Sequence, residues 1–313
     1  MTLHRLMDEP SDGLGAALDR FERHFTYPLG DHARFRISHG QRYLPFFRAM
    51  GEATVLVVEQ RGEVLGTLAC IRRTLRLGEG EGEAVSTHYL CDLKVEPRAR
   101  GGLVLGRLII EARRLIEPDP SHACHAIVMD GTGALPTDYT GRIGIPGFRR
   151  VADIVILRLS KGAATESSGV GWVQEEGQKR MDRPVCRLTG GNSGMRSAMS
   201  AVRLGEMGSA AWGTLEDTRL GKRLWLDTGE ELVSGHVSGF GFREGRAGAE
   251  VLKRALELAE GAGMPGVFVS MPPSACAEVI PHLNGVMVQG SGAGIYGHDL
   301  PIGHDWWVDT AEI

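Results

Sequence analysis

Residues 89–116, YLCDLKVEPRARGGLVLGRLIIEARRLI, place a strand, a loop and a helix in immediate succession. The strand is rich in apolar residues and stops at Pro97, because proline cannot donate to a β-ladder. Over residues 103–116 apolar side chains recur at helical spacing, which predicts an amphipathic helix. A strand that turns through small residues straight into a helix leaves main-chain N–H groups unpaired at the positive end of the helix dipole, a geometry that binds phosphate. The local pattern alone leaves open a phosphate-binding loop or an ordinary turn.

This stretch resembles the acetyl-CoA-binding motif of the GNAT acetyltransferase superfamily, in which a strand ending in V-x-P is followed by R/Q-x-x-G-x-G/A and a helix. The matching letters are DLKVEP at 92–97, RGG at 100–102 and GRLI at 106–109. With Arg100 leading, leucines at 103 and 105 take the two glycine positions. With Arg98 leading, Gly101 fits and Leu103 takes the last position. A third option is a one-residue insertion that brings Gly106 into the final glycine position.

The resemblance implies a GNAT fold, acetyl-CoA as cosubstrate and transfer of its acyl group to an amine. In this family the strand before the loop binds the pantetheine arm through its main chain, and the loop binds the diphosphate. The cofactor-binding residues that the resemblance implies are Leu93, Lys94, Val95, Arg98, Arg100, Gly101, Gly102, Leu103, Val104, Leu105, Gly106 and Arg107.

Three side chains are candidates for proton transfer, because acyl transfer to an amine needs a base for the ammonium and an acid for the departing thiolate. By the same resemblance, Asp92 lies where several polyamine-type members of the family carry a pair of acidic residues, and Cys91 replaces the first of that pair. The other interpretation of Asp92 is a carboxylate at the strand edge that pairs with Lys94. Tyr139 resembles the tyrosine that comes shortly before G-F in the family's terminal helix motif. The resemblance implies that its phenol protonates the departing thiolate; the alternative is a tyrosine that only packs on the sheet. Asp130 is a second candidate base at a strand end, although Asp-Gly also forms simple turns.

The predicted elements up to residue 159 follow the order helix, hairpin, strand, helix, strand, helix, strand, which matches the GNAT fold. Residues 163–171 are poor in large apolar side chains and predict a linker. The second half repeats the first in outline, with helices predicted at 195–204 and 249–262 and a glycine-rich loop at 292–297. We therefore predict an α/β (α+β) protein of two GNAT-like domains, each a mixed, mostly antiparallel sheet flanked by helices: an acyltransferase domain at 1–162 and a degenerate copy at 172–313. Mycothiol synthases and the Fem-type and myristoyl transferases are similar in outline.

Composition narrows the class of protein. A chain of 313 residues with 42% hydrophobic and 24% charged residues has enough apolar side chains for a sizeable core, which argues against global disorder. A net charge of -4 argues against nucleic-acid binding. Five scattered cysteines without a CxxC pair predict a reduced, cytoplasmic protein, and no apolar run is long enough to span a membrane. His122, Cys124 and His125 have no second ligand pair at zinc spacing, so no metal is predicted.

The sequence thus predicts an N-acetyltransferase that uses acetyl-CoA and acts on a small-molecule or peptide amine, with the chemistry in the first half. A non-catalytic acyl-CoA-binding protein or a scaffold is the alternative, because leucines replace motif glycines. The acceptor is not identified by these patterns, and a homodimer is left open.

Overall fold

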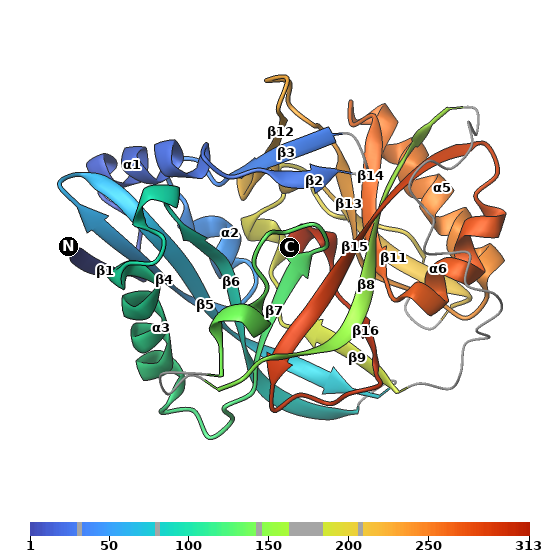
Figure 1. Ribbon diagram of the computed structural model, residues 1–313. Helices are drawn as coiled ribbons and strands as arrows, with labels where there is room; N and C mark the ends of the chain where they lie inside the picture. The colour runs from blue at the N-terminus through green and yellow to red at the C-terminus, as the bar shows by residue number, and fades with distance from the viewer. Residues whose placement is uncertain (30–32, 79–81, 142–145, 163–183, 206–208) are drawn as a thin grey trace.

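The structure is a computed structural model that describes residues 1–29, 33–78, 82–141, 146–162, 184–205 and 209–313 (Figure 1). The predicted linker at 163–171 lies outside the described residues, so the division into two domains stays a prediction. No helix in the described ranges is both long enough and apolar enough to cross a membrane.

A large mixed sheet runs through the molecule (Figure 1). Its strands lie in the order β1 (Thr2–Leu6), β4 (Glu52–Gln60), β5 (Glu63–Leu77), β6 (Glu83–Val95), β7 (Cys124–Met129), β15 (Val286–His298), β8 (Arg149–Lys161), β14 (Gly266–Met271), β13 (Gly235–Phe242), β11 (Ala211–Glu216) and β10 (Val202–Arg203). Beside this path, β9 (Val185–Thr189) pairs with β5 and with β16 (Asp305–Trp307). Neighbouring strands are antiparallel except β6 with β7, β13 with β14 and β9 with β16, which confirms the predicted mixed, mostly antiparallel sheet.

Helices cover both faces of this sheet because side chains along a strand alternate between the faces. In β4, Val55 and Val57 pack beneath α1 (Asp12–Glu22) and α2 (Leu44–Arg48), whereas Leu56 and Val58 pack against α3 (Leu103–Ile116). Around β13 and β14, α5 (Gly245–Gly261) and α6 (Pro273–Val279) bury another apolar cluster. The amphipathic helix predicted at 103–116 is confirmed. The remaining helical turns are α4 (Pro136–Tyr139), η1 (Pro97–Ala99), η2 (Ser193–Met195), η3 (Thr218–Leu220), η4 (Ile280–His282) and η5 (Thr310–Glu312).

Strands from the two ends of the chain are interleaved in the large sheet. β15 lies between β7 and β8, and β8 in turn pairs with β14. The predicted glycine-rich loop at 292–297 is wrong, because these residues belong to β15. The glycines serve close packing: a Cβ at Gly294 would lie 2.7 Å from the ring of Tyr296, and one at Gly297 would lie 2.6 Å from the main-chain oxygen of Cys124.

The helix predicted at 195–204 is also wrong. A single 3-10 turn ends at Met195, and β10 forms at 202–203. Between them the side chain of Arg196 is buried and donates to the carboxylates of Glu216 and Glu312. Tertiary ion pairing, which local periodicity does not report, therefore sets the path of this segment.

A small second sheet lies over one side of the large one (Figure 1). It consists of β12 (Arg223–Leu226), β3 (Ala33–Ser38) and β2 (Tyr27–Leu29), all antiparallel. Phe35 from β3 and Leu224 from β12 are buried together with Phe268 of the large sheet. Segments more than 180 residues apart in the chain therefore cover one cavity, described next.

Candidate active site

A cavity of about 640 Å³ opens where β6 and β7 diverge. The two strands are parallel and pair only at His88 with Cys124 and at Tyr89 with His125. Beyond these residues β6 continues to Val95 along β5, while β7 continues along β15. The edge of β6 from residue 90 onward therefore has no strand partner among the described residues. Its main-chain groups are available to an extended ligand.

A β-bulge in β6 lies at the point of divergence. Thr67 pairs with Lys94 and Ala69 pairs with Cys91, so two residues of β6, Asp92 and Leu93, stand opposite a single residue of β5. Asp92 has a φ of 54°, in the left-handed region that non-glycine residues rarely adopt. The Thr67 hydroxyl donates to the main-chain oxygen of Asp92 at 2.8 Å and holds the bulge. Backbone strain of this kind is concentrated at functional sites.

The Asp92 carboxylate is already well supplied with donors. Lys94 Nζ lies 2.5 Å from its Oδ1, the Tyr43 hydroxyl donates to its Oδ2, and Thr67 Oγ1 donates to Oδ2 at 3.2 Å. Burial opposes the charge of Lys94, but Asp92, Tyr27 and Glu22 outweigh it, so the Lys94 pKa is raised. The structure thus contains the Asp92–Lys94 pair that was the alternative to catalysis. The role of Asp92 as base stays a prediction.

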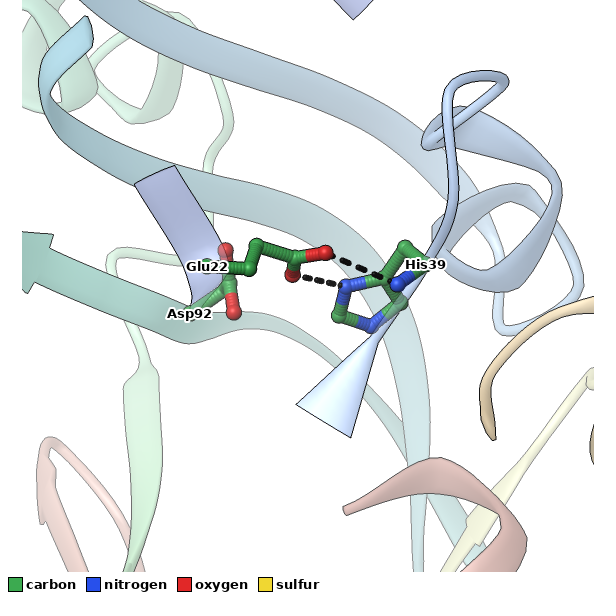
Figure 2. A group of neighbouring side chains, drawn as sticks. All are labelled: Glu22, His39 and Asp92. Atoms are coloured by element: carbon green, nitrogen blue, oxygen red, sulfur yellow. Dashed lines mark hydrogen bonds and ion pairs between the residues drawn. The ribbon is translucent and has the colours of Figure 1, made fainter. Parts of the chain in front are cut away.

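Two further residues complete this buried charged group, and the sequence patterns did not single them out. Glu22 closes α1, and His39 follows β3; His39 Nδ1 lies 2.6 Å from Glu22 Oε1 (Figure 2). One ligand-type atom from each of Glu22, His39 and Asp92 lies within 4.8 Å of the other two. Lys94 Nζ is 3.2 Å from Glu22 Oε1 as well, so an ammonium already bridges the two carboxylates where a metal ion would bind. A sequence feature that could have indicated this charged group is Glu22, because it is a charged residue on the otherwise apolar face of the segment that forms α1.

The loop between β6 and α3 leads directly into the N-terminus of a helix, and its role in binding phosphate stays a prediction. Gly101 has a φ of 77°, and α3 begins after Gly102 with no side chain capping its first turn. The first amides of a helix, here those of residues 103–105, have no carbonyl partner one turn earlier in the helix. The Leu103 side chain is 68% exposed, whereas Val104 is buried and anchors the turn. Of the two leucines that replace motif glycines, Leu103 points its side chain into solvent and Leu105 is partly buried.

Arg98 and Arg100 lie in the loop and Arg107 lies in α3, and each of these three predicted arginines has a different partner. Arg98 pairs with Glu63 on β5, Arg100 Nε donates to the main-chain oxygen of Val95 at 3.4 Å, and Arg107 donates to that of Met1 at 2.9 Å. All three residues are exposed. They add positive charge beside the helix N-terminus, which favours an anion there.

The other two predicted catalytic residues have different surroundings. Tyr139, in α4, is half-buried in the cavity wall, where burial and then Asp138 raise the pKa of its phenol to about 12. Asp130 is exposed, does not line the cavity and lies 3.3 Å from Arg150. The structure therefore brings Tyr139 and Asp92 to one cavity and leaves Asp130 outside it. Their catalytic roles stay predictions.

The C-terminal part of the chain forms the far wall of the cavity. Lys222 Nζ donates to the main-chain oxygen of Thr310 at 2.9 Å and to that of Ile313. His236 Nδ1 lies 3.0 Å from Thr310 Oγ1. Burial, and then the charges of Lys222 and Arg196, lower the His236 pKa well below its ordinary value, so this imidazole is neutral.

Two solved structures of Saccharomyces cerevisiae N-myristoyltransferase resemble this one over nearly its whole length. One, with bound myristoyl-CoA, has a TM-score of 0.52 at 11% identity, covering 96% of this chain and 84% of that chain. The other, with bound myristoyl-CoA and inhibitors, has a TM-score of 0.53 at 12% identity, covering 97% and 82%. No protein-family model matches the sequence, and no curated protein matches it significantly. At 11–12% identity the likeness is one of fold, and it agrees with the predicted mixed, mostly antiparallel sheet flanked by helices.

Proposed function

We propose that this protein is an acyl-CoA-dependent N-acyltransferase that transfers acetyl from acetyl-CoA to a primary amine of a small molecule or a peptide. The observation that carries the proposal is the divergence of β6 and β7 at a strained bulge, followed directly by the uncapped N-terminus of α3. An open strand edge can form main-chain hydrogen bonds with the amides of the pantetheine arm, and a helix N-terminus can bind the diphosphate. The fold shared with a myristoyl-CoA-binding transferase agrees with this assignment.

In this proposal the main chain of Leu93, Lys94 and Val95 binds pantetheine, and residues 98–107 bind the diphosphate. The thioester would then lie beside the bulge at Asp92, facing the cavity. The cavity wall there combines apolar residues with Asp92 and His39 of the buried charged group. A largely apolar wall excludes water and strengthens electrostatic interactions with the developing oxyanion.

Calorimetry with CoA, acetyl-CoA and octanoyl-CoA tests the proposal. We expect saturable binding of CoA and acetyl-CoA with Kd below about 1 mM, a usual range for enzyme substrates. The octanoyl thioester tests acyl-chain length, because a cavity of about 640 Å³ is larger than an acetyl group needs. Release of free thiol in the presence of a primary-amine panel then measures transfer. Absence of binding at millimolar ligand would contradict the proposal.

A non-catalytic acyl-CoA-binding protein or scaffold is the second candidate. It is favoured by the leucines at positions 103 and 105, where the motif carries glycines. Binding of acetyl-CoA without transfer to any amine of the panel would support this candidate.

The phenol of Tyr139 is proposed as the acid that protonates the departing thiolate. Because its pKa is raised to about 12, the phenol keeps its proton at neutral pH and is available as a donor. Tyr139→Phe is expected to lower kcat about 10- to 100-fold while leaving the Kd for CoA unchanged. Steady-state thiol release and calorimetry measure the two quantities. Equal kcat values for the variant and the native protein would show that the ring only packs.

A further inference from the structure

A glutamate–histidine pair lies beside the bulge, and its histidine, His39, lines the cavity. The His39 side chain is only 2% exposed, and its ring packs among Tyr43, Phe46 and Phe47, with ring centroids 4.8–5.2 Å away. Glu22 accepts from the His39 main-chain N–H at 2.8 Å through Oε2, and its Oε1 lies 2.6 Å from Nδ1. Two contacts to one carboxylate fix both the position and the orientation of the imidazole (Figure 2).

The pair determines which nitrogen of His39 carries the proton. Burial opposes ionisation of Glu22, but His39 and Lys94 outweigh it, so the Glu22 pKa is lowered and the carboxylate is ionised. An ionised carboxylate only accepts hydrogen bonds, so Nδ1 must be the protonated nitrogen. In an uncharged ring that donates from Nδ1, the lone pair lies on Nε2. Nε2 is buried and has no hydrogen-bond partner within the described part of the chain.

The proposed reaction needs such a group. An acceptor amine is an ammonium at neutral pH and must lose a proton before it can attack a thioester. Asp92 is a poor choice because Lys94, Tyr43 and Thr67 already donate to its carboxylate. His39 carries the opposite arrangement: one nitrogen is held by a carboxylate and the other is unpartnered, as in a carboxylate-oriented histidine base.

We propose that His39 is the general base of this protein and that Glu22 is its positioning residue; this rests on the proposed N-acyltransferase function. His39 Nε2 takes one proton from the acceptor ammonium. The freed nitrogen lone pair attacks the thioester carbon, so that a C–N bond forms and the C–S bond breaks. Tyr139 gives its phenolic proton to the departing CoA thiolate, the second ammonium proton restores that phenol, and the proton on His39 passes to solvent. The charged and titratable groups around the ring are Glu22 from α1, Asp92 and Lys94 from β6, and Tyr43 before α2.

Two small acceptors of different basicity distinguish a base from a structural histidine. n-Propylamine is protonated at neutral pH and needs a base, whereas hydroxylamine is largely uncharged there and needs little help. With acetyl-CoA as donor, His39→Gln is expected to lower the rate of transfer to n-propylamine by about 100-fold, the usual contribution of a general base. The rate with hydroxylamine is expected to fall less than about threefold, because its nitrogen is already neutral.

The matched control is His4→Gln. His4 Nε2 also contacts a glutamate, Glu59, at 3.2 Å, but this pair lies on β1 and β4, outside the cavity wall. We expect His4→Gln to leave both rates unchanged. Glu22→Gln keeps the shape of its side chain but removes the charge, so it should lower the n-propylamine rate selectively, as His39→Gln does. Glu22→Gln therefore tests the role of the pair even if His39→Gln does not fold.

Calorimetry with CoA distinguishes failure of the proposed His39 role from failure of the proposed N-acyltransferase function. Selective loss with n-propylamine, while CoA binding is retained, supports His39 as base. Equal loss with both amines, or no loss, overturns this role and leaves the transferase assignment intact. Failure of the native protein to bind CoA, or to acetylate either amine, overturns the proposed function and the role of His39 with it.

Discussion

Glu312→Ala is expected to lower the free energy of unfolding by about 3–5 kcal/mol, because it removes one partner from a buried ion network. Glu312 Oε2 accepts from Arg73 at 2.8 Å and its Oε1 accepts from Arg196 at 3.0 Å, and each of these side chains is at most 3% exposed. Without Glu312 the guanidinium of Arg73 stays buried, with an Nε that has no partner among the described residues, and Arg196 keeps its bonds to Glu216. Urea denaturation followed by tryptophan fluorescence measures the loss.

An exposed ion pair supplies the control for this experiment. Glu257 lies 2.9 Å from Arg254 on α5, and both side chains are more than 60% exposed. Glu257→Ala is expected to change stability by at most about 0.5 kcal/mol, because solvent screens such pairs. If Glu312→Ala cost no more than Glu257→Ala, the buried network would not be a main support of the fold. The network matters because it ties β5 to the C-terminal segment that walls the cavity.

Leu103→Pro is expected to weaken CoA binding about 10- to 100-fold, because it removes one main-chain donor from the proposed diphosphate site. A hydrogen bond to a charged group contributes about 1.5–3 kcal/mol. Leu103 is the first residue of α3 and its side chain is exposed, so proline is compatible with the helix there. The backbone of Gly102, with φ of -94° and ψ of -162°, is extended, as a residue before proline must be. Calorimetry with CoA gives the change in Kd.

Leu103→Ala is the matched control, because it removes the same side chain and keeps the N–H. It should leave the Kd for CoA within about twofold of the native value, since only the main-chain donor is proposed to bind. Thermal unfolding should be similar for the two variants. Equal weakening by both would assign the effect to the side chain, and no weakening by Leu103→Pro would place the diphosphate elsewhere.

The sequence by itself determined those features that depend on local periodicity and turn chemistry. The strand ending before Pro97, the helix at 103–116 and the strong helix near 249–262 are present because apolar spacing shows which face of an element is buried. The mixed, mostly antiparallel sheet followed from the order of these elements and from the resemblance of residues 92–109. The same family resemblance singled out Tyr139 and Asp92, and both line the cavity.

Only the tertiary structure decided which side chains meet. Glu22, His39 and Lys94 come from α1, from the end of β3 and from β6, so no spacing along the chain could pair them. The segment predicted as a helix at 195–204 carries Arg196, whose partners Glu216 and Glu312 lie 20 and 116 residues along the chain and so could not be read from local spacing. The glycines of 292–297 form a strand because β15 lies between β7 and β8. Periodicity reports that a face is buried, but the order of strands in the sheet determines what that face is buried against.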